Sequence, residues 1–255
     1  MSETRFLEVA ITAIQKAESI IMKSLSGDLQ VIRKPDGSPV THVDKDVENI
    51  IIKTIGEHFP DHGFLGEEFG RKNEESKFTW VIDPIECTMN FTRKLPIFST
   101  ELALMEGDEV ILGISNAPLL HALMYAEKGK GAFLNGKPVK VSSISKLDEA
   151  YICYGGLAQF EKKERTQDLL DLLKHGWRNR GFGDFWGYQL LSQGRADAMV
   201  EAGAMIWDIA ACKIIVEEAG GKLTDFNGDS ILKKDSTSVV ATNGKIHDEV
   251  LEFFK

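Results

Sequence analysis

Residues 80–91 read WVIDPIECTMNF, and in this stretch a carboxylate follows directly on an apolar run. The run 78–82 predicts a short buried strand, and the Asp83-Pro84 pair ends it. Strand ends in open α/β folds are where ligands bind, so Asp83 is a candidate ligand-binding residue. The alternative interpretation of Asp83 is a turn residue before proline.

Two further carboxylates stand beside apolar runs. Glu67 follows residues 64–66 (FLG), and Asp208 follows residues 205–207 (MIW). Taken singly, Glu67 fits a loop charge, and Asp208 fits a residue that caps the helix it begins. Carboxylates that meet in one cleft repel one another unless they are protonated or bridged by cations. Oxygen ligands favour Mg²⁺ or Mn²⁺, and the lack of a neighbouring His or Cys cluster in the sequence argues against zinc.

Hydrophobic periodicity predicts the order of elements along the chain. Helices are expected over 5–25, 44–59, 161–174, 185–193, 207–219 and 245–254. Strands are expected over 78–82, 99–105, 110–116, 122–127, 151–154, 198–201 and 239–242. The pair Asn135-Gly136 predicts a hairpin turn between 133–134 and 139–141.

The order of these segments indicates two halves. Residues 1–145 are expected to form an antiparallel α+β subdomain that carries the metal-binding loops. Residues 146–255 alternate strand and helix, as in an α/β subdomain that completes the active-site cleft. Two packed subdomains with a cleft between them fit this order, so the expected class is mixed α+β and α/β.

The composition argues against a protein that binds nucleic acid or spans a membrane. The 255 residues include 30 Lys and Arg against 39 Asp and Glu, which gives a net charge of −9. Such a chain repels nucleic acid and anionic lipid at long range, and no apolar run reaches the length of a membrane span. The amino-terminal stretch is expected to be a helix and not a signal peptide. Three cysteines without CxxC spacing favour a reducing, cytoplasmic location.

Three motifs in order resemble the inositol monophosphatase superfamily of Mg²⁺-dependent, lithium-sensitive phosphomonoesterases. They are 66–68 (GEE), 80–91, which is similar to the family's DPIDGTxNF, and 207–211 with 217–221 (WDIAA and EEAGG). The resemblance covers nearly the whole chain. It implies the layered αβαβα sandwich of the sugar-phosphatase type, a small phosphorylated metabolite as substrate, and a homodimer.

The resemblance also implies the metal ligands. Glu67, Asp83 and the backbone carbonyl of Ile85 would hold one Mg²⁺, and Asp83, Glu86 and Asp208 would hold a second. A third, weaker ion would share the Glu67 side of the site. Mn²⁺ is the alternative metal.

The implied reaction needs no covalent phosphoenzyme. Thr88, paired with Asp44, would orient and deprotonate the attacking water, and Glu67 joins them in the catalytic set. The N–H groups of Cys87 and Thr88 would receive the phosphate at the start of the following helix. From the residues alone, Asp44 and Thr88 are each also explained as N-caps of helices.

Two positions depart from the family pattern. Glu86-Cys87 stands where the family has Asp-Gly, and Cys212 stands where it has a small residue. Glutamate adds a methylene, and cysteine brings a Cβ where glycine can take a positive φ. Cys87 is expected to be a passive filler, with a reactive thiol as the alternative. The departures leave two hypotheses: an active enzyme, which we favour, and a catalytically impaired relative that acts as a metal- or phosphate-binding regulatory subunit.

Substrate choice depends on the second half of the chain. Residues 180–188 (RGFGDFWGY) look like the histidinol-phosphate phosphatases of this superfamily, and Asp184 either meets the amine of histidinol phosphate or caps the helix that follows. Glu201 matches the position that contacts substrate hydroxyls in the family, and is otherwise a surface charge. Glu86 and Asp208 are expected on the substrate side as well. Histidinol phosphate is the expected substrate, with inositol monophosphate as the alternative.

Overall fold

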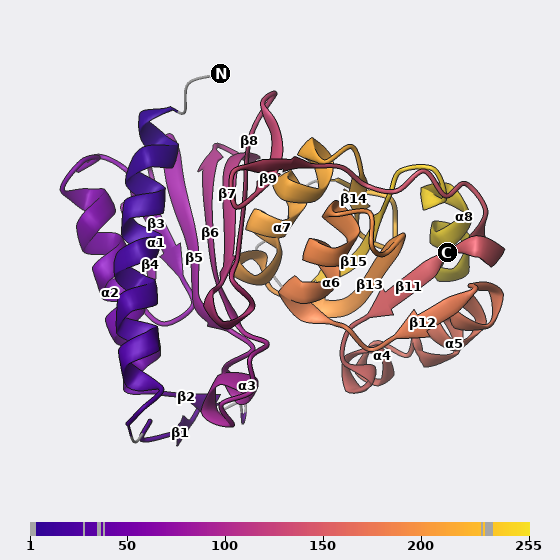
Figure 1. Cartoon of the computed structure of the whole chain (residues 1–255), viewed down its shortest axis with the longest axis horizontal. Coiled ribbons are helices and arrows are strands. Elements are labelled where there is room, and N and C mark those ends of the chain that lie inside the picture. The colour runs from indigo at the N-terminus through magenta and orange to yellow at the C-terminus, as the bar shows by residue number, and fades with distance from the viewer. Residues whose placement is uncertain (1–3, 28, 35–36, 38, 231, 233–236) are drawn as a thin grey trace.

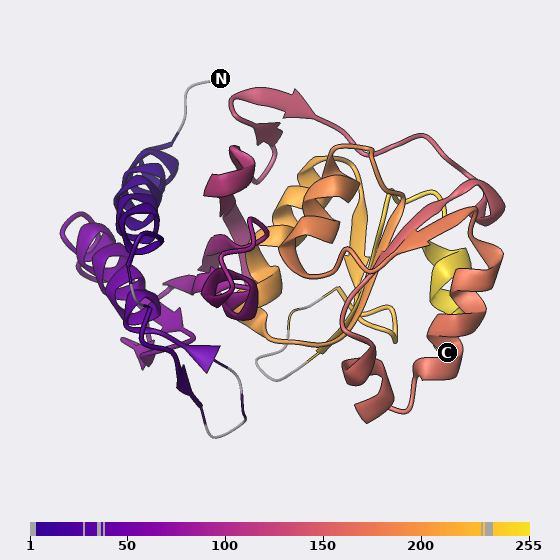
Figure 2. The same ribbon diagram turned by 60° about the horizontal axis from the view of Figure 1, so that its bottom comes forward.

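The computed structural model describes residues 4–27, 29–34, 37, 39–230, 232 and 237–255. These residues stack as alternating layers of helix, sheet, helix, sheet and helix, which follow one another across Figure 1. Figure 2 shows the same succession from another side, with the amino-terminal helices at one flank and the carboxy-terminal helix at the other. The predicted layered sandwich is confirmed.

The first layer consists of α1 (Arg5–Ser24) and α2 (His42–Gly56), which lie side by side (Figure 1). Each helix buries an apolar face against the first sheet, with Ala13, Ile21 and Ile51 fully buried. The helical period in the sequence therefore predicted both helices. Within the described residues, none of the helices combines the length and apolarity that a bilayer crossing requires.

Helix α2 begins at His42, two residues before the predicted start. Thr41 is its N-cap, because the Thr41 hydroxyl accepts a hydrogen bond from the Val43 N–H at 3.1 Å. The Asp44 carboxylate accepts in return from the Thr41 N–H at 2.8 Å, which completes a capping box. The interpretation of Asp44 as the N-cap is thus wrong: it is the third helical residue.

The first sheet has its strands in the order β10-β9-β8-β7-β6-β5-β3-β4. All neighbours are antiparallel except β3 and β5, which run parallel, so the predicted antiparallel half is a mixed sheet. The predicted turn at Asn135-Gly136 joins β9 to β10, with both residues in the left-handed region. The bounds are β3 (Gly63–Gly66), β4 (Gly70–Lys72), β5 (Phe78–Glu86), β6 (Ser99–Glu106), β7 (Glu109–Ala117), β8 (Ala122–Glu127), β9 (Gly131–Leu134) and β10 (Lys137–Val139). Short elements accompany the sheet: β1 (Ile32–Arg33) pairs with β2 (Pro39–Val40), and α3 (Thr88–Thr92) and η1 (Pro118–Leu120) are single turns.

Strand β5 continues past its predicted end at residue 82 and reaches Glu86. Its pairing with β6 shifts between Asp83 and Glu86, because Pro84 has no N–H for the ladder. The Pro84 carbonyl accepts instead from the Thr100 hydroxyl at 2.9 Å. Side chains three residues apart point to opposite faces of a regular strand, whereas this bulge turns Asp83 and Glu86 towards one cavity.

The second sheet has the order β12-β11-β13-β15-β14, in which β11 runs parallel to β12 and β13, and β15 runs antiparallel to its neighbours. Strand β13 extends three residues beyond its predicted end at 201. The bounds are β11 (Tyr151–Tyr154), β12 (Arg178–Arg180), β13 (Ala198–Ala204), β14 (Lys222–Thr224) and β15 (Thr237–Thr242).

Helices of the second half occupy the remaining two layers. The predicted helix 161–174 is two helices, broken at residues 163–165, and the last predicted helix ends in a 3₁₀ turn. Between the sheets lie α6 (Asp184–Ser192) and α7 (Ile206–Glu218), and on the outer face lie α4 (Leu157–Lys162), α5 (Thr166–His175), α8 (His247–Leu251) and η3 (Glu252–Phe254), with η2 (Leu147–Glu149) preceding β11 (Figure 1).

Helix α7 belongs to the second half of the sequence but covers the first sheet. It buries apolar side chains in two core clusters and contacts strands of both sheets. A Cβ on Gly113 of β7 would lie 2.6 Å from the Ile214 Cγ2 atom of α7, so the helix and the strand meet without a side chain between them. The division at residue 145 stays a prediction, since the packing of α7 joins the two halves.

Candidate active site

A cavity of about 560 Å³ gathers almost all of the predicted site residues. It opens where β3, β5 and β13 end and where α3, α6 and α7 begin. Asp44 does not line it, but lies behind Thr88. The predicted residues that do line it are Glu67, Asp83, Ile85, Glu86, Cys87, Thr88, Asp184, Glu201 and Asp208.

Three carboxylates form an acidic centre in this cavity. Asp83, Glu86 and Asp208 each offer an oxygen, and these oxygens lie within 4.8 Å of one another. Burial raises the pKa of Asp83 well above its usual range, and the charges of Glu67 and Asp208 raise it further. Burial also raises the pKa of Asp208 to about 7, although the Met205 N–H opposes the shift.

This centre fits a divalent cation. The Oδ1 atom of Asp83 is buried and has no hydrogen-bond partner among the described residues. A buried carboxylate oxygen without a donor costs free energy, and neighbouring like charges add to that cost. A metal ion would remove both costs, and the all-oxygen ligand set matches a hard ion.

Asp208 is the third residue of α7 and lies in the first turn of this helix, as one of its interpretations predicts, while its role as a metal ligand stays a prediction. Its Oδ2 atom accepts from the Met205 N–H at 2.7 Å and so caps the start of α7. The same carboxylate faces Asp83 and Glu86. Capping holds the side chain in one orientation, which favours a preorganised ligand.

Lys34 reaches the Glu67 side of the cavity, and sequence analysis missed it. Its Nζ atom lies 2.7 Å from Glu67 Oε1 and 2.5 Å from Glu68 Oε1. Burial lowers the pKa of Lys34, but hydrogen bonds to the two carboxylates outweigh this and raise it above its usual value. The ammonium thus neutralises part of the Glu67-Glu68 charge.

Glu48 of α2 fixes the loop that carries Glu67, and no local signal in the sequence pointed to it. Its carboxylate accepts from the Glu68 N–H at 2.8 Å and the Phe69 N–H at 3.1 Å. Burial raises the pKa of Glu48 to about 7, and these N–H groups oppose the shift. Gly66 is required here, since a Cβ would lie 1.8 Å from Glu48 Oε1.

Thr88 and Asp44 meet as predicted. The Thr88 hydroxyl lies 3.4 Å from Asp44 Oδ1 and 2.9 Å from the Ile85 carbonyl oxygen. Burial raises the pKa of Asp44 to about 6, although hydrogen bonds from Thr41 lower it. Thr88 is the first residue of α3 and not its N-cap, because Cys87 occupies that position.

Cys87 links the two halves of the cavity wall. Its Sγ atom lies 3.0 Å from Asp184 Oδ2. Burial and the charges of Glu86 and Asp184 raise the pKa of the Cys87 thiol above its usual value. Asp184 is the first residue of α6, with Gly183 as N-cap, so the capping interpretation of Asp184 is wrong.

Glu201 of β13 lines the cavity and is half-buried, where a surface charge was the alternative. It accepts a hydrogen bond from the Tyr188 hydroxyl at 2.9 Å. Burial raises the pKa of Glu201 to about 8, and the charge of Asp184 contributes. Gln159 also lines this end of the cavity and was not predicted.

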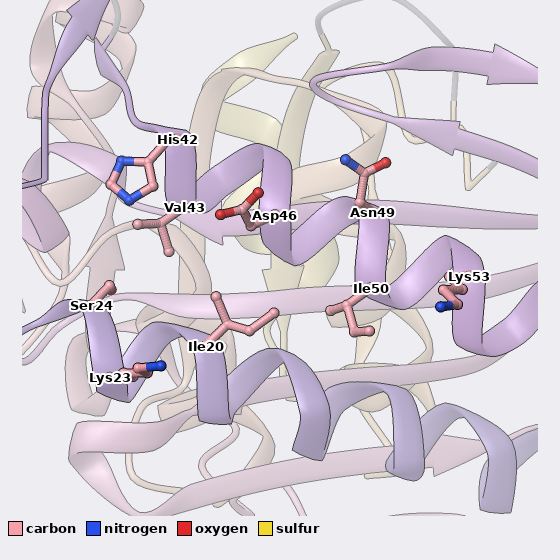
Figure 3. A pocket seen from close by; sticks show the side chains of 9 residues that line it. All are labelled: Ile20, Lys23, Ser24, His42, Val43, Asp46, Asn49, Ile50 and Lys53. Atoms are coloured by element: carbon pink, nitrogen blue, oxygen red, sulfur yellow. The ribbon is translucent and has the colours of Figure 1, made fainter.

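A second hollow lies between α1 and α2, and Figure 3 shows the side chains that line it. Its volume is about 620 Å³, and its polar side chains include Lys23, Lys53 and Asp46. None of the predicted site residues lines it, and its charges are mixed. The chemistry therefore belongs to the acidic cavity.

The model of the inositol monophosphatase family matches residues 2–254 of this sequence. The chain belongs to the inositol monophosphatase family. Members of this family are metal-dependent phosphoric monoester hydrolases, and this chain is one of them. The catalytic, substrate-binding or metal-binding role of each residue in the cavity stays a prediction.

Relatives with assigned names and solved structures agree with this membership. Histidinol-phosphatase of Mycobacterium tuberculosis is 37% identical over 229 residues, which cover 88% of this chain and 87% of that protein. Histidinol-phosphatase of Streptomyces coelicolor is 35% identical and covers 99% of this chain and 97% of its own. The solved structure of an inositol monophosphatase family enzyme, the Thermotoga maritima IMPase, superposes with a TM-score of 0.87 at 33% identity, over 98% of this chain and 97% of that one.

Proposed function

We propose that the protein hydrolyses histidinol phosphate with Mg²⁺ as its metal. The observation that carries this proposal is the Asp184 carboxylate on the cavity wall: no ion pair within the described part of the chain involves it. A carboxylate without a cation beside the phosphate site is suited to a substrate that brings its own ammonium group. The two histidinol-phosphatase relatives support the same substrate.

The metal ligands are those placed in the cavity. Glu67, Asp83 and the Ile85 carbonyl would hold one Mg²⁺, and Glu86 and Asp208 with Asp83 would hold a second. A third, weaker ion would share Glu67. The chemistry that such ions supply is activation of water and stabilisation of charge on the phosphoryl and leaving-group oxygens. The longer Glu86 side chain keeps two oxygens for this purpose.

The protein's own residues then handle the proton and the phosphate. The Thr88 hydroxyl donates a hydrogen bond to Asp44, so Thr88 would pass its own proton to the Asp44 carboxylate as its oxygen takes a proton from the attacking water. Thr41 and the start of α2 hold Asp44 in place for this relay. The N–H groups of Cys87 and Thr88 would receive phosphate oxygens. Binding in this way would hold the ester beside the proton relay, and such positioning lowers the barrier to reaction.

Beside the acidic centre, Asp184 and Glu201 receive the rest of the substrate, and an Asp184 carboxylate oxygen lies within 4.8 Å of one from Glu86. Two neighbouring carboxylates repel each other, and an ammonium group between them is stabilised by both. Inositol monophosphate is the second candidate, because the Glu201 carboxylate, which accepts from the buried Tyr188 hydroxyl, can also accept hydrogen bonds from substrate hydroxyl groups. An impaired regulatory subunit is the third candidate, and it is favoured only by the Glu86-Cys87 departure.

The test compares Asp184→Asn with the parent on histidinol phosphate and on inositol 1-phosphate. Loss of a charged hydrogen bond should lower kcat/KM for histidinol phosphate about 10- to 100-fold and change inositol 1-phosphate much less. Asp248→Asn, an exposed carboxylate on α8, is the matched control. Equal losses on both esters would contradict recognition of a cation by Asp184. If the parent turns over neither ester, the regulatory hypothesis replaces the enzyme.

A further inference from the structure

Two residues that face each other in the cavity wall both have strained backbones. Cys87 has φ 66° and Asp184 has φ 56°, so both lie in the left-handed region without being glycine. Such conformations cost free energy and persist where the surrounding structure requires them, often at functional sites. A glycine at position 87 would remove the cost there, so the side chain of Cys87 calls for an explanation.

The two side chains meet across the cavity. Cys87 follows β5 in the first sheet, and Asp184 begins α6 in the helical layer between the sheets. The distance from Cys87 Sγ to Asp184 Oδ2 is 3.0 Å. An ionised carboxylate only accepts hydrogen bonds, so the thiol is the donor.

Nothing else described in the structure holds the Asp184 carboxylate in this orientation. No other hydrogen bond or ion pair to a described residue involves the Asp184 carboxylate. Gly183 fixes the backbone before it, since a Cβ there would lie 2.9 Å from the Gly155 Cα atom. The backbone is therefore held by close packing, while the carboxylate is held by Cys87.

We propose that Cys87 is a positioning residue that sets substrate specificity: its S–H group holds the Asp184 carboxylate where the ammonium group of the substrate binds. This rests on the proposed function, because it assumes that Asp184 recognises a cation. Under this proposal, the Glu86-Cys87 pair, which stands where the family has Asp-Gly, serves substrate binding. Cys87 acts through Asp184 and touches no reacting atom in this role.

Four variants of the full chain test the proposal: Cys87→Ala, Cys87→Ser, Asp184→Asn and the double variant Cys87→Ala/Asp184→Asn. Steady-state kinetics with histidinol phosphate and with glycerol 2-phosphate, which has no cation, give the ratio of the two kcat/KM values. Binding of L-histidinol, measured by calorimetry, reports on the same pocket without turnover. Cys153→Ala is the matched control, because Cys153 is buried in the second sheet away from the cavity.

For Cys87→Ala we expect a roughly tenfold fall in the kcat/KM ratio, because one hydrogen bond to a charged group is lost. The fall should come mainly from a higher KM for histidinol phosphate, and L-histidinol should bind more weakly. Cys87→Ser keeps a donor and should recover most of the ratio. In the Asp184→Asn background, Cys87→Ala should change the ratio less than about twofold, because both act through one interaction.

Three results would overturn the inference, and the third is distinguishable from the first two. Suppose that the parent prefers histidinol phosphate. If Cys87→Ala keeps this preference, or if its kcat/KM falls by the same factor on both esters, the role of Cys87 alone is overturned. Independent, multiplying effects of Cys87→Ala and Asp184→Asn do the same. A parent with no preference for histidinol phosphate over glycerol 2-phosphate overturns the proposed substrate, and the inference with it.

Discussion

The carboxylates around the cavity are held in different ways, and this decides what each can do. Asp44 is fixed by two hydrogen bonds from Thr41 and keeps a second oxygen for Thr88. Asp83 has an oxygen without any described partner. A fully supported carboxylate is suited to accept a proton, whereas an unsatisfied buried one is suited to bind a cation.

Asp44→Asn tests the proton relay. Asp44 must be ionised to accept a proton, and burial raises its pKa to about 6. The kcat/KM of the parent should therefore fall as the pH drops below about 6. The amide cannot accept a proton, so the variant should lose about 100-fold in kcat near pH 8 and lack this acidic limb. The measurement is a pH profile of kcat/KM. An unchanged acidic limb in the variant would assign Asp44 to capping alone.

Asp83→Asn tests the metal site without any turnover. The amide removes a buried charge among like charges, so the metal-free variant should unfold about 2–4 °C above the metal-free parent, which is ~1 kcal/mol at this chain length. Millimolar Mg²⁺ should then stabilise the parent and not the variant, since only binding to the folded state raises Tm. The measurement is thermal unfolding with EDTA and with Mg²⁺. A variant that still gains stability from Mg²⁺ would contradict Asp83 as a ligand.

At the scale of elements, the sequence predicted features that depend on local patterns and missed features that depend on long-range contacts. The helical period located α1 and α7, and the resemblance to the family implied in advance that Asp83, Glu86 and Asp208 meet. The end of β5 was misplaced, because a proline bulge inside a strand has the same local signature as a turn after one. The residues Lys34 and Glu48 were missed, because each acts on the Glu67 loop from a distant element.

Gly66→Ala tests how α2 holds the Glu67 loop. The new Cβ would overlap the Glu48 carboxylate, so either Glu48 or the loop must move, at a cost of about 1–3 kcal/mol in the free energy of unfolding. Mg²⁺ affinity should fall with it, because Glu67 is displaced. Gly56→Ala is the matched control: nothing lies within 4 Å of its Cβ, and no loss is expected. Urea unfolding and metal titration give both readouts, and equal stabilities for the two variants would rule out the predicted overlap.

At the scale of the whole molecule, α7 ties the two sheets together. It buries apolar side chains against both, so neither half of the chain keeps its core without the other. The acidic centre sits where both halves meet, and part of the net charge of −9 is concentrated there. The homodimer, the cytoplasmic location and the lithium sensitivity stay predictions.

Because α7 packs against both sheets, we expect one cooperative unfolding transition. In EDTA, calorimetry should show a single peak whose calorimetric and van't Hoff enthalpies agree. Two separate peaks would show that residues 1–145 and 146–255 unfold independently.

The central claim is that this acidic cavity hydrolyses a cationic phosphate monoester with Mg²⁺. Phosphate release by the purified parent, measured on histidinol phosphate, inositol 1-phosphate and an aryl phosphate, tests it most directly. The expected result is turnover that needs millimolar Mg²⁺, stops with EDTA, and has its highest kcat/KM on histidinol phosphate. No phosphate release from any of the three esters at millimolar Mg²⁺ would contradict the claim.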